Sequence, residues 1–218
     1  VEMDVRSVAG IVNRGGTILH SSRCPEFREE EQRARAAETL TRHEIDGLIV
    51  LGGNGTLQGA WALSQQTQLP IIGVPKTIDN DIYGTELTIG FTSALRIGTM
   101  ALDRLHSTGN SHHRVMVCEL MGRNAGWLTL ASGLASGSDV ILIPEIPFDI
   151  DKICAFVEER RSGESGFSII ACAEGARSND GNQVVSEFDP TSPDPIRLGG
   201  IAAQVAYEIE QKTNIQSR

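Results

Sequence analysis

The chain has 218 residues and a formal net charge of −9, because 28 Asp and Glu residues outnumber 19 Lys and Arg residues. This acidity argues against a nucleic-acid-binding protein, which needs basic residues gathered on one face, and no apolar run reaches the roughly 18 to 20 residues of a membrane helix. The 4 cysteines form no C-x-x-C pair, which disfavours a zinc site or a disulfide framework and is typical of a reducing, cytoplasmic protein.

Short apolar strands alternate with helical stretches along the chain. In chain order the expected elements are a helix at 26–43, a strand at 45–51, a helix at 57–64, a strand at 71–74, a helix at 91–106, a strand at 114–120, a helix at 125–135, a strand at 140–143, a helix at 150–161 and a strand at 168–173. Continuous apolar strands separated by helices predict parallel sheets covered on both faces. The polar, proline-containing stretch at 177–197 is expected to be a long turn.

Ligands of such sheets bind at the carboxyl ends of the strands. The first loop to inspect is G-G-N-G-T at 52–56, between a strand and a helix. Glycines allow close backbone approach to a phosphate, and the N-terminus of the following helix supplies unpaired N–H groups. The alternative is a tight turn capped by Thr56. The loop indicates phosphate and does not specify the substrate.

The second loop, P-K-T-I-D-N-D at 75–81, is more specific. It places Asp79 and Asp81 beside Lys76, directly after a buried strand. Such carboxylates are costly near a buried strand unless they have a function. An aspartate there can accept a hydroxyl proton while a nearby cation stabilises a transferring phosphoryl group. The alternative is a turn with solvated acids.

Two further loops follow strands. In the M-G-R-N loop, Gly122 allows close backbone approach and Arg123 can fork onto a phosphate or a carboxylate. Glu174 follows the strand at 168–173 and suits sugar hydroxyls. Each alone is compatible with an ordinary turn, but four polar loops at one sheet edge predict an active site.

In this order and spacing the loops resemble those of the 6-phosphofructokinase family. The similarity runs along essentially the whole chain, and the T-I-D-N-D and M-G-R-N motifs are its most specific parts. The matching stretches are 14–23, 52–56, 75–81, 83–91, 111–129, 143–145 and 173–176. The resemblance implies an α/β fold of two Rossmann-like three-layer domains with mainly parallel sheets. It assigns residues 1–90 to part of a donor-binding domain and 91–218 to part of a fructose 6-phosphate-binding domain.

The resemblance also implies roles for individual residues, in a phosphoryl transfer from ATP to the 1-hydroxyl of fructose 6-phosphate during glycolysis. Asp79 is implied to be the general base. The implied sugar-phosphate contacts are Thr77, Ile78, Asp79, Met121, Gly122, Arg123 and Glu174, with Arg114 and Arg218 reaching the site of a neighbouring subunit in a homodimer or homotetramer. The implied donor contacts are Arg23, Cys24, Gly53, Asn54, Gly55, Thr56 and Lys76. Mg²⁺ is the implied cofactor, beside Asn54 and Asp81.

This sequence departs from the family pattern at several points. Asn54 stands where the family usually has a magnesium-binding aspartate, and its neutral amide is expected to hold a hard cation less strongly. The family's opening glycine-rich phosphate loop and its later half are absent, so the sequence is expected to be an internal fragment. Gly55 leaves room for the α-phosphate of ATP, whereas Lys76 is compatible with either ATP or pyrophosphate.

Pyrophosphate therefore remains an alternative donor. A second alternative is a non-catalytic, sugar-phosphate-binding paralogue, motivated by Asn54 and opposed by Asp79, Asp81 and Arg123. A lipid or NAD kinase shares the glycine loop at 52–56, but the motifs at 77–81 and 121–124 argue against it.

Overall fold

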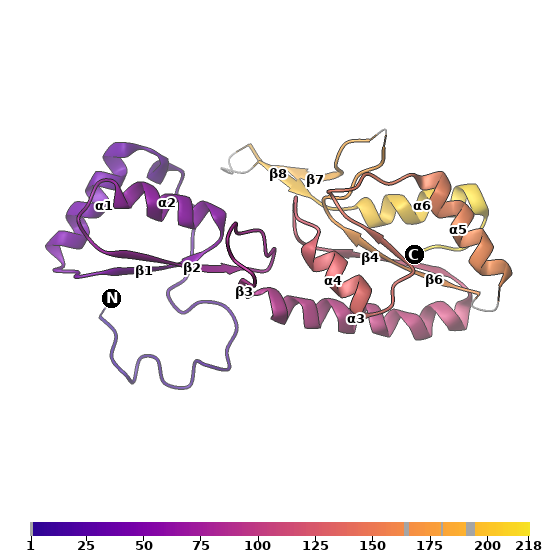
Figure 1. The fold of residues 1–218 in the computed structure, drawn as a ribbon, viewed down its shortest axis with the longest axis horizontal. Helices are drawn as coiled ribbons and strands as arrows, with labels where there is room; N and C mark the ends of the chain where they lie inside the picture. Colours follow the sequence, from indigo (N-terminus) through magenta and orange to yellow (C-terminus); the bar gives the residue numbers. More distant parts are fainter. Residues whose placement is uncertain (1, 164–165, 180, 191–194) are drawn as a thin grey trace.

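The computed structural model describes residues 2–163, 166–179, 181–190 and 195–218. Figure 1 shows two lobes side by side, with the long helix α3 leading from one to the other. The first lobe contains η1 (Pro25–Arg28), α1 (Glu30–Arg42), β1 (Leu48–Gly52), α2 (Asn54–Ser64), β2 (Ile71–Thr77) and β3 (Ile89–Gly90). The second contains α3 (Phe91–His112), β4 (Val115–Leu120), α4 (Trp127–Ala135), β5 (Val140–Leu142), α5 (Ile150–Ser162), β6 (Ser168–Ala173), β7 (Val185–Phe188), β8 (Ile196–Leu198) and α6 (Ile201–Thr213).

The first lobe is built on a parallel sheet of order β1-β2-β3. Helix α2 packs so closely on this sheet that a Cβ at Gly73 would lie 2.9 Å from the side chain of Leu57. The opposite face carries Ile49, Leu51 and Ile72, which are 64%, 57% and 61% exposed. In the part of the chain that the structure describes, helices thus cover one face of this sheet (Figure 1).

The second lobe has three layers around a parallel sheet of order β4-β6-β5. The central strand β6 is buried along its whole length, because α3 and α4 cover one face while α5 and α6 cover the other (Figure 1). Its small and apolar residues suit that doubly covered position. The lobe confirms the α/β fold with parallel sheets that the alternating pattern predicted.

Several boundaries differ from the sequence-based expectation. Helix α3 extends six residues past 106 and ends where His113 adopts a left-handed conformation, with φ of 51°. Gly109 lies inside α3, and glycine is needed there because a Cβ would come within 2.9 Å of Phe167. The helix expected at 26–43 is divided into η1 and α1.

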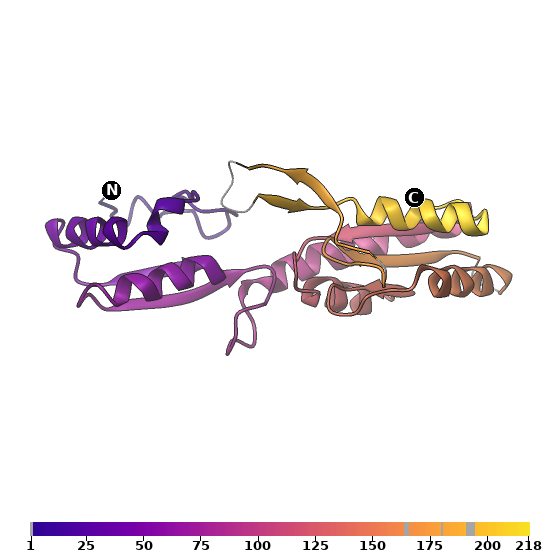
Figure 2. The ribbon, with the colours of Figure 1, turned by 90° about the horizontal axis from the view of Figure 1, so that it is seen from above.

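The stretch at 177–197 holds more than a turn. Strands β7 and β8 form an antiparallel ribbon, which lies beside the junction of the two lobes in both views (Figures 1 and 2). The alternation of apolar and polar residues in β7 and β8 is too short to be recognised in the sequence. None of the helices within the described ranges is long and apolar enough to cross a membrane.

Candidate active site

The glycine loop at 52–56 forms the start of α2. β1 ends at Gly52, and Gly53 is the N-cap of α2, with no side chain capping the helix. Glycine is required at 52 because a Cβ would clash with the side chain of Thr56. A Cβ at Gly55 would meet nothing within 4 Å, so the loop is open on that side. An uncapped first turn with an open approach suits an anion, and the Thr56-capped turn is not what forms.

The loop after β2 is held by side-chain hydrogen bonds. β2 runs three residues further than expected, to Thr77, because Lys76 and Thr77 pair with β3. The loop then turns at Asn80, whose φ is 54°. The Asn80 Oδ1 accepts hydrogen bonds from the backbone N–H of Thr88 (2.9 Å) and from its hydroxyl (3.2 Å). The backbone N–H of Asp79 donates to Thr77 Oγ1 at 3.2 Å, which orients the intervening turn.

Asp79 is half-buried, and its pKa is raised above the ordinary carboxyl value. Burial is the largest cause, and the negative charges of Asp81 and Glu174 raise the pKa further. The hydrogen bond from Thr77 and the positive charge of Arg123 oppose the shift. Charges act on each other most strongly across short distances. Asp79 of the first lobe is thus within electrostatic reach of Arg123 and Glu174 of the second lobe.

Glu174 fixes the loop that carries Arg123. Its Oε1 accepts the backbone N–H groups of Gly122 (3.1 Å) and Arg123 (2.8 Å). Gly122 and Arg123 both have positive φ, 143° and 50°. Glycine is required at 175 because a Cβ would clash with the carbonyl oxygen of Arg123. The loops after β4 and β6 are thus one interlocked unit, and Arg123 is held in a conformation that few non-glycine residues adopt.

Three more hydrogen bonds complete this unit, and none of them has a local signal in the sequence. The side-chain amide of Gln183 donates to Asn124 Oδ1 (2.9 Å) and to the carbonyl oxygen of Gly175 (3.1 Å). The Arg123 guanidinium donates to the carbonyl oxygen of Ile196 on β8 at 3.2 Å. Gln183 lies in an irregular polar stretch, where no periodicity signals its position. The same holds for Asn80 and Thr88, whose bond only the folded loop shows.

Most of the expected donor contacts share one cavity. It has a volume of about 820 Å³ and lies between the segment before α1, the strand β1 and the start of α2. Arg23, Cys24, Gly55 and Thr56 line it, and Arg123 reaches it from the second lobe. Gly53 lies behind them, with its Cβ position 3.7 Å from Thr77. The glycine loop at 52–56 and the loop that carries Arg123 therefore face the same space.

Asn54 and Asp81 lie in direct contact. The Nδ2 of Asn54 donates to Asp81 Oδ2 at 2.8 Å, so the amide presents its NH₂ group to the carboxylate. A hard cation binds carbonyl and carboxylate oxygens and is repelled by an N–H donor. Across the described ranges, no group of three His, Cys, Asp or Glu side chains could hold a metal ion. Asn54 and Asp81 therefore do not form a site at which the protein alone, without a bound donor, would hold a divalent cation.

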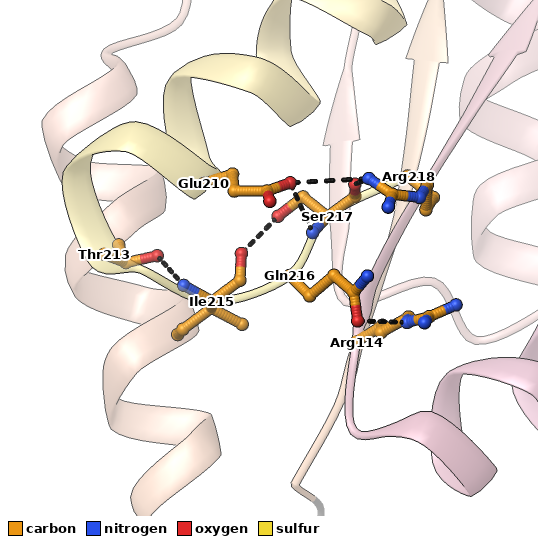
Figure 3. Close-up of polar contacts among 7 residues, drawn as sticks. All are labelled: Arg114, Glu210, Thr213, Ile215, Gln216, Ser217 and Arg218. Atoms are coloured by element: carbon orange, nitrogen blue, oxygen red, sulfur yellow. Dashed lines mark hydrogen bonds and ion pairs between the residues drawn. The ribbon is translucent and has the colours of Figure 1, made fainter.

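Arg114 and Arg218 lie away from Asp79. Arg114 precedes β4 and Met121 follows it, so about 23 Å separates the two ends at roughly 3.3 Å per residue. Figure 3 shows the Arg114 Nε donating to Gln216 Oε1 at 2.7 Å, while Arg218 pairs with Glu210 at 3.6 Å. The backbone of Arg218 bonds to Val115 and Val117, which places both arginines along β4. Within one chain they do not join the site around Asp79.

Three further predicted site residues lie beside the loops that follow β2 and β4. Lys76 is exposed on β2, Ile78 is half-buried beside Asp79, and Met121 is 62% exposed after β4.

Comparison with known proteins matches residues 1–218 to the family described as Phosphofructokinase. The chain is 49% identical over 222 residues to ATP-dependent 6-phosphofructokinase 2 of Clostridium perfringens, covering 96% of this chain and 60% of the relative. It is 43% identical over 218 residues to the pyrophosphate–fructose 6-phosphate 1-phosphotransferase of Streptomyces coelicolor, covering 100% of this chain and 64% of the relative.

Among solved structures, Pichia pastoris phosphofructokinase in the T-state has a TM-score of 0.82 at 31% identity, covering 99% of this chain and 23% of that chain. The phosphofructokinase of Saccharomyces cerevisiae has a TM-score of 0.77 at 32% identity, covering 94% of this chain and 28% of that chain. The chain spans 60% and 64% of the length of the two relatives above. These likenesses extend over both lobes and every loop described, and the chain belongs to the phosphofructokinase family.

Proposed function

We propose that this chain forms part of a 6-phosphofructokinase, which transfers a phosphoryl group from ATP to the 1-hydroxyl of fructose 6-phosphate and yields fructose 1,6-bisphosphate. The observation that carries the proposal is Asp79, a half-buried carboxyl whose pKa is raised by burial and by Asp81. A carboxyl with a raised pKa, in a site with an arginine and another acid, is suited to general-base chemistry. Several relatives bear the name ATP-dependent 6-phosphofructokinase, which supports this reaction.

In the proposed reaction Asp79 accepts the proton of the 1-hydroxyl while that oxygen attacks the terminal phosphorus of ATP. The bond from this phosphorus to the bridging oxygen breaks, and ADP leaves with the bonding electron pair. Arg123 is the proposed anchor of the sugar phosphate because its guanidinium can donate two parallel hydrogen bonds. Glu174 Oε2 is the proposed acceptor of a sugar hydroxyl, since Oε1 already accepts two backbone N–H groups. Thr77, Ile78, Met121 and Gly122 would line the sugar.

The donor is proposed to bind in the cavity that Arg23, Cys24, Gly55 and Thr56 line. The open space at Gly55 supports ATP, because nothing there obstructs an α-phosphate. Pyrophosphate is the second candidate, supported by Lys76 and by the name of the Streptomyces coelicolor relative. Residues 1–90 would then form part of the donor half, and 91–218 part of the sugar-phosphate half.

Mg²⁺ is the proposed cofactor, and it would neutralise charge on the donor phosphates. Magnesium in such sites keeps several waters and binds one or two carboxylates together with substrate phosphates. Asp81 is the carboxylate proposed to contact metal that arrives with the donor, and its Oδ2 also accepts the amide of Asn54. Glycolysis in the cytoplasm is the proposed setting, and the four free cysteines are compatible with a reducing compartment.

A homodimer or homotetramer is the proposed assembly. Arg114 and Arg218 lie along β4, far from Asp79 of their own chain, so both would act on a neighbour's sugar phosphate. An isolated subunit would then lack two phosphate contacts.

The test is the steady-state rate of fructose 1,6-bisphosphate formation by the full-length protein that contains this chain, with ATP and with pyrophosphate. We expect saturable turnover with ATP. Turnover with pyrophosphate alone would select the second donor, and no turnover with either, despite binding of fructose 6-phosphate, would select a non-catalytic sugar-phosphate-binding protein. Substituting Gly55→Asp should abolish the ATP reaction if ATP occupies this cavity, because the carboxylate would fill the open space and repel phosphate.

A further inference from the structure

The contact between Asn54 and Asp81 joins two segments that are 27 residues apart in sequence. Asn54 is the first residue of α2, and Asp81 lies in the loop after β2. The 2.8 Å distance from Nδ2 to Oδ2 is that of a well-formed hydrogen bond. This bond therefore ties the start of the phosphate-facing helix to the loop that carries Asp79.

The atoms in this contact exclude a cation from the same position. The NH₂ group carries partial positive charge and points at the carboxylate, which is where a bridging cation would have to lie. The carbonyl oxygen of Asn54 is the only atom of that side chain that binds a hard metal ion, and the NH₂ group occupies its place beside Asp81. Elsewhere in the described part of the chain, no cluster of three metal-binding side chains offers an alternative.

The local charge is compatible with an amide in place of a metal ion. The negative charges of Asp81 and Glu174 and the positive charge of Arg123 all act on Asp79. A carboxylate at position 54 would face Asp81 across a hydrogen-bond distance, and two carboxylates so close need a proton or a cation between them. An amide needs neither, because it donates directly.

We propose that the side-chain amide of Asn54 substitutes for a protein-bound divalent cation beside Asp81, so that the free protein binds no such cation there and metal enters only with the phosphates of the donor. The first half of this proposal does not depend on the proposed function, whereas the second half does.

The experiment measures Mn²⁺ binding to the full chain by the loss of the free-ion paramagnetic resonance signal, without donor or sugar. The wild-type protein, Asn54→Asp and Asn110→Asp are compared. Asn110 is exposed near the C-terminal end of α3, so its substitution adds the same charge away from the site. We expect Asn54→Asp to bind Mn²⁺ about tenfold or more tightly than the wild type, since the charge of the ligands sets affinity for hard cations. Asn110→Asp should match the wild type.

Thermal unfolding supplies a second readout. In EDTA, Asn54→Asp should unfold at a lower temperature than both the wild type and Asn110→Asp, and Mn²⁺ should reverse the loss in that variant alone. The proposal is overturned if the wild-type protein binds Mn²⁺ as tightly as Asn54→Asp, or if Mn²⁺ stabilises all three proteins equally. Because neither readout requires turnover, a failure of the proposed kinase activity would leave these results interpretable.

The entry of metal with the donor is tested by repeating the titration with the non-hydrolysable analogue of ATP in which an imido group joins the β- and γ-phosphates. We expect the wild-type protein to bind Mn²⁺ only when this analogue is present. Asp81→Ala should weaken the binding of Mn²⁺ in the presence of the analogue. Equal Mn²⁺ uptake with and without the analogue would contradict this half of the proposal.

Discussion

The loops of the two lobes are stabilised to different degrees. In the second lobe, Glu174 accepts two backbone N–H groups and Gln183 bridges the loops after β4 and β6. In the first lobe, bonds between Asn80 and Thr88 hold the loop after β2. The start of α2 has no side-chain cap and is joined to that loop by the bond from Asn54 to Asp81. The loop that carries Gly122 and Arg123 is therefore preorganised before any ligand binds, whereas the glycine loop at 52–56 is open to solvent on one side. This difference suits the fixed sugar phosphate and the large, charged donor of the proposed function.

The largest expected effect comes from replacing Asp79, on which charges from both lobes act. Asp79→Asn keeps the shape of the side chain but removes the proton acceptor, so kcat should fall by about 10²- to 10⁴-fold. Binding of fructose 6-phosphate, measured by calorimetry, should persist. Asp103→Asn, on an exposed position of α3, is the control and should leave kcat unchanged. If kcat of Asp79→Asn stays within a few-fold of the wild type, Asp79 is not the base.

Glu174→Ala tests whether the second lobe is preorganised. It leaves the N–H groups of Gly122 and Arg123 without their charged acceptor, and each such bond contributes about 1.5–3 kcal/mol. We expect at least about tenfold weaker binding of fructose 6-phosphate and faster amide exchange at 122–124. Glu145→Ala is the matched control, since Glu145 accepts the N–H of Gly126 at 2.8 Å and does not act on Asp79. Equal losses in both variants would contradict a specific role for Glu174.

The pH dependence of the activity tests whether Asp81 raises the pKa of Asp79 in the first lobe. Asp79 must be ionised to accept a proton, and its pKa is raised, so activity should fall at a higher pH than for an ordinary carboxyl as the solution is acidified. Asp81→Asn removes one like charge and should move the acidic limb of kcat/KM to lower pH. The movement should be partial because burial, the larger cause of the raised pKa, remains. A limb that stays in place, or moves to higher pH, would show that Asp81 does not act on Asp79.

The smallest expected effect comes from Gln183→Ala. Two neutral hydrogen bonds would be lost from the interlocked loops, each contributing about 0.5–1.5 kcal/mol, so KM for fructose 6-phosphate should rise by about 2- to 10-fold while kcat changes little. The control is Gln204→Ala, because Gln204 is an exposed glutamine on α6 that bonds to Glu208 at 2.9 Å. A change in kcat without a change in KM would mean that Gln183 acts elsewhere.

Local patterns predicted much of the fold. The alternation of apolar strands and helices located most of the strands of both sheets, since burial on two faces requires continuous apolar residues. The antiparallel strands β7 and β8 and the continuation of α3 through Gly109 were missed. Both involve packing against distant segments: position 109 needs glycine because Phe167 and Ile169 leave no room for a side chain on that part of α3.

For the site, the sequence alone determined which loops carry chemistry, because a strand followed by glycine, aspartate or arginine is a local signal. Only the tertiary structure decided which of those loops meet. It places Asp79 near Glu174, which lies on the other lobe, and separates Arg114 from both along β4. It also decided how Asn54 is used, since only folding brings its amide to Asp81. Hydrogen bonds and charges act over a few ångströms, and chain folding, not sequence spacing, sets those distances.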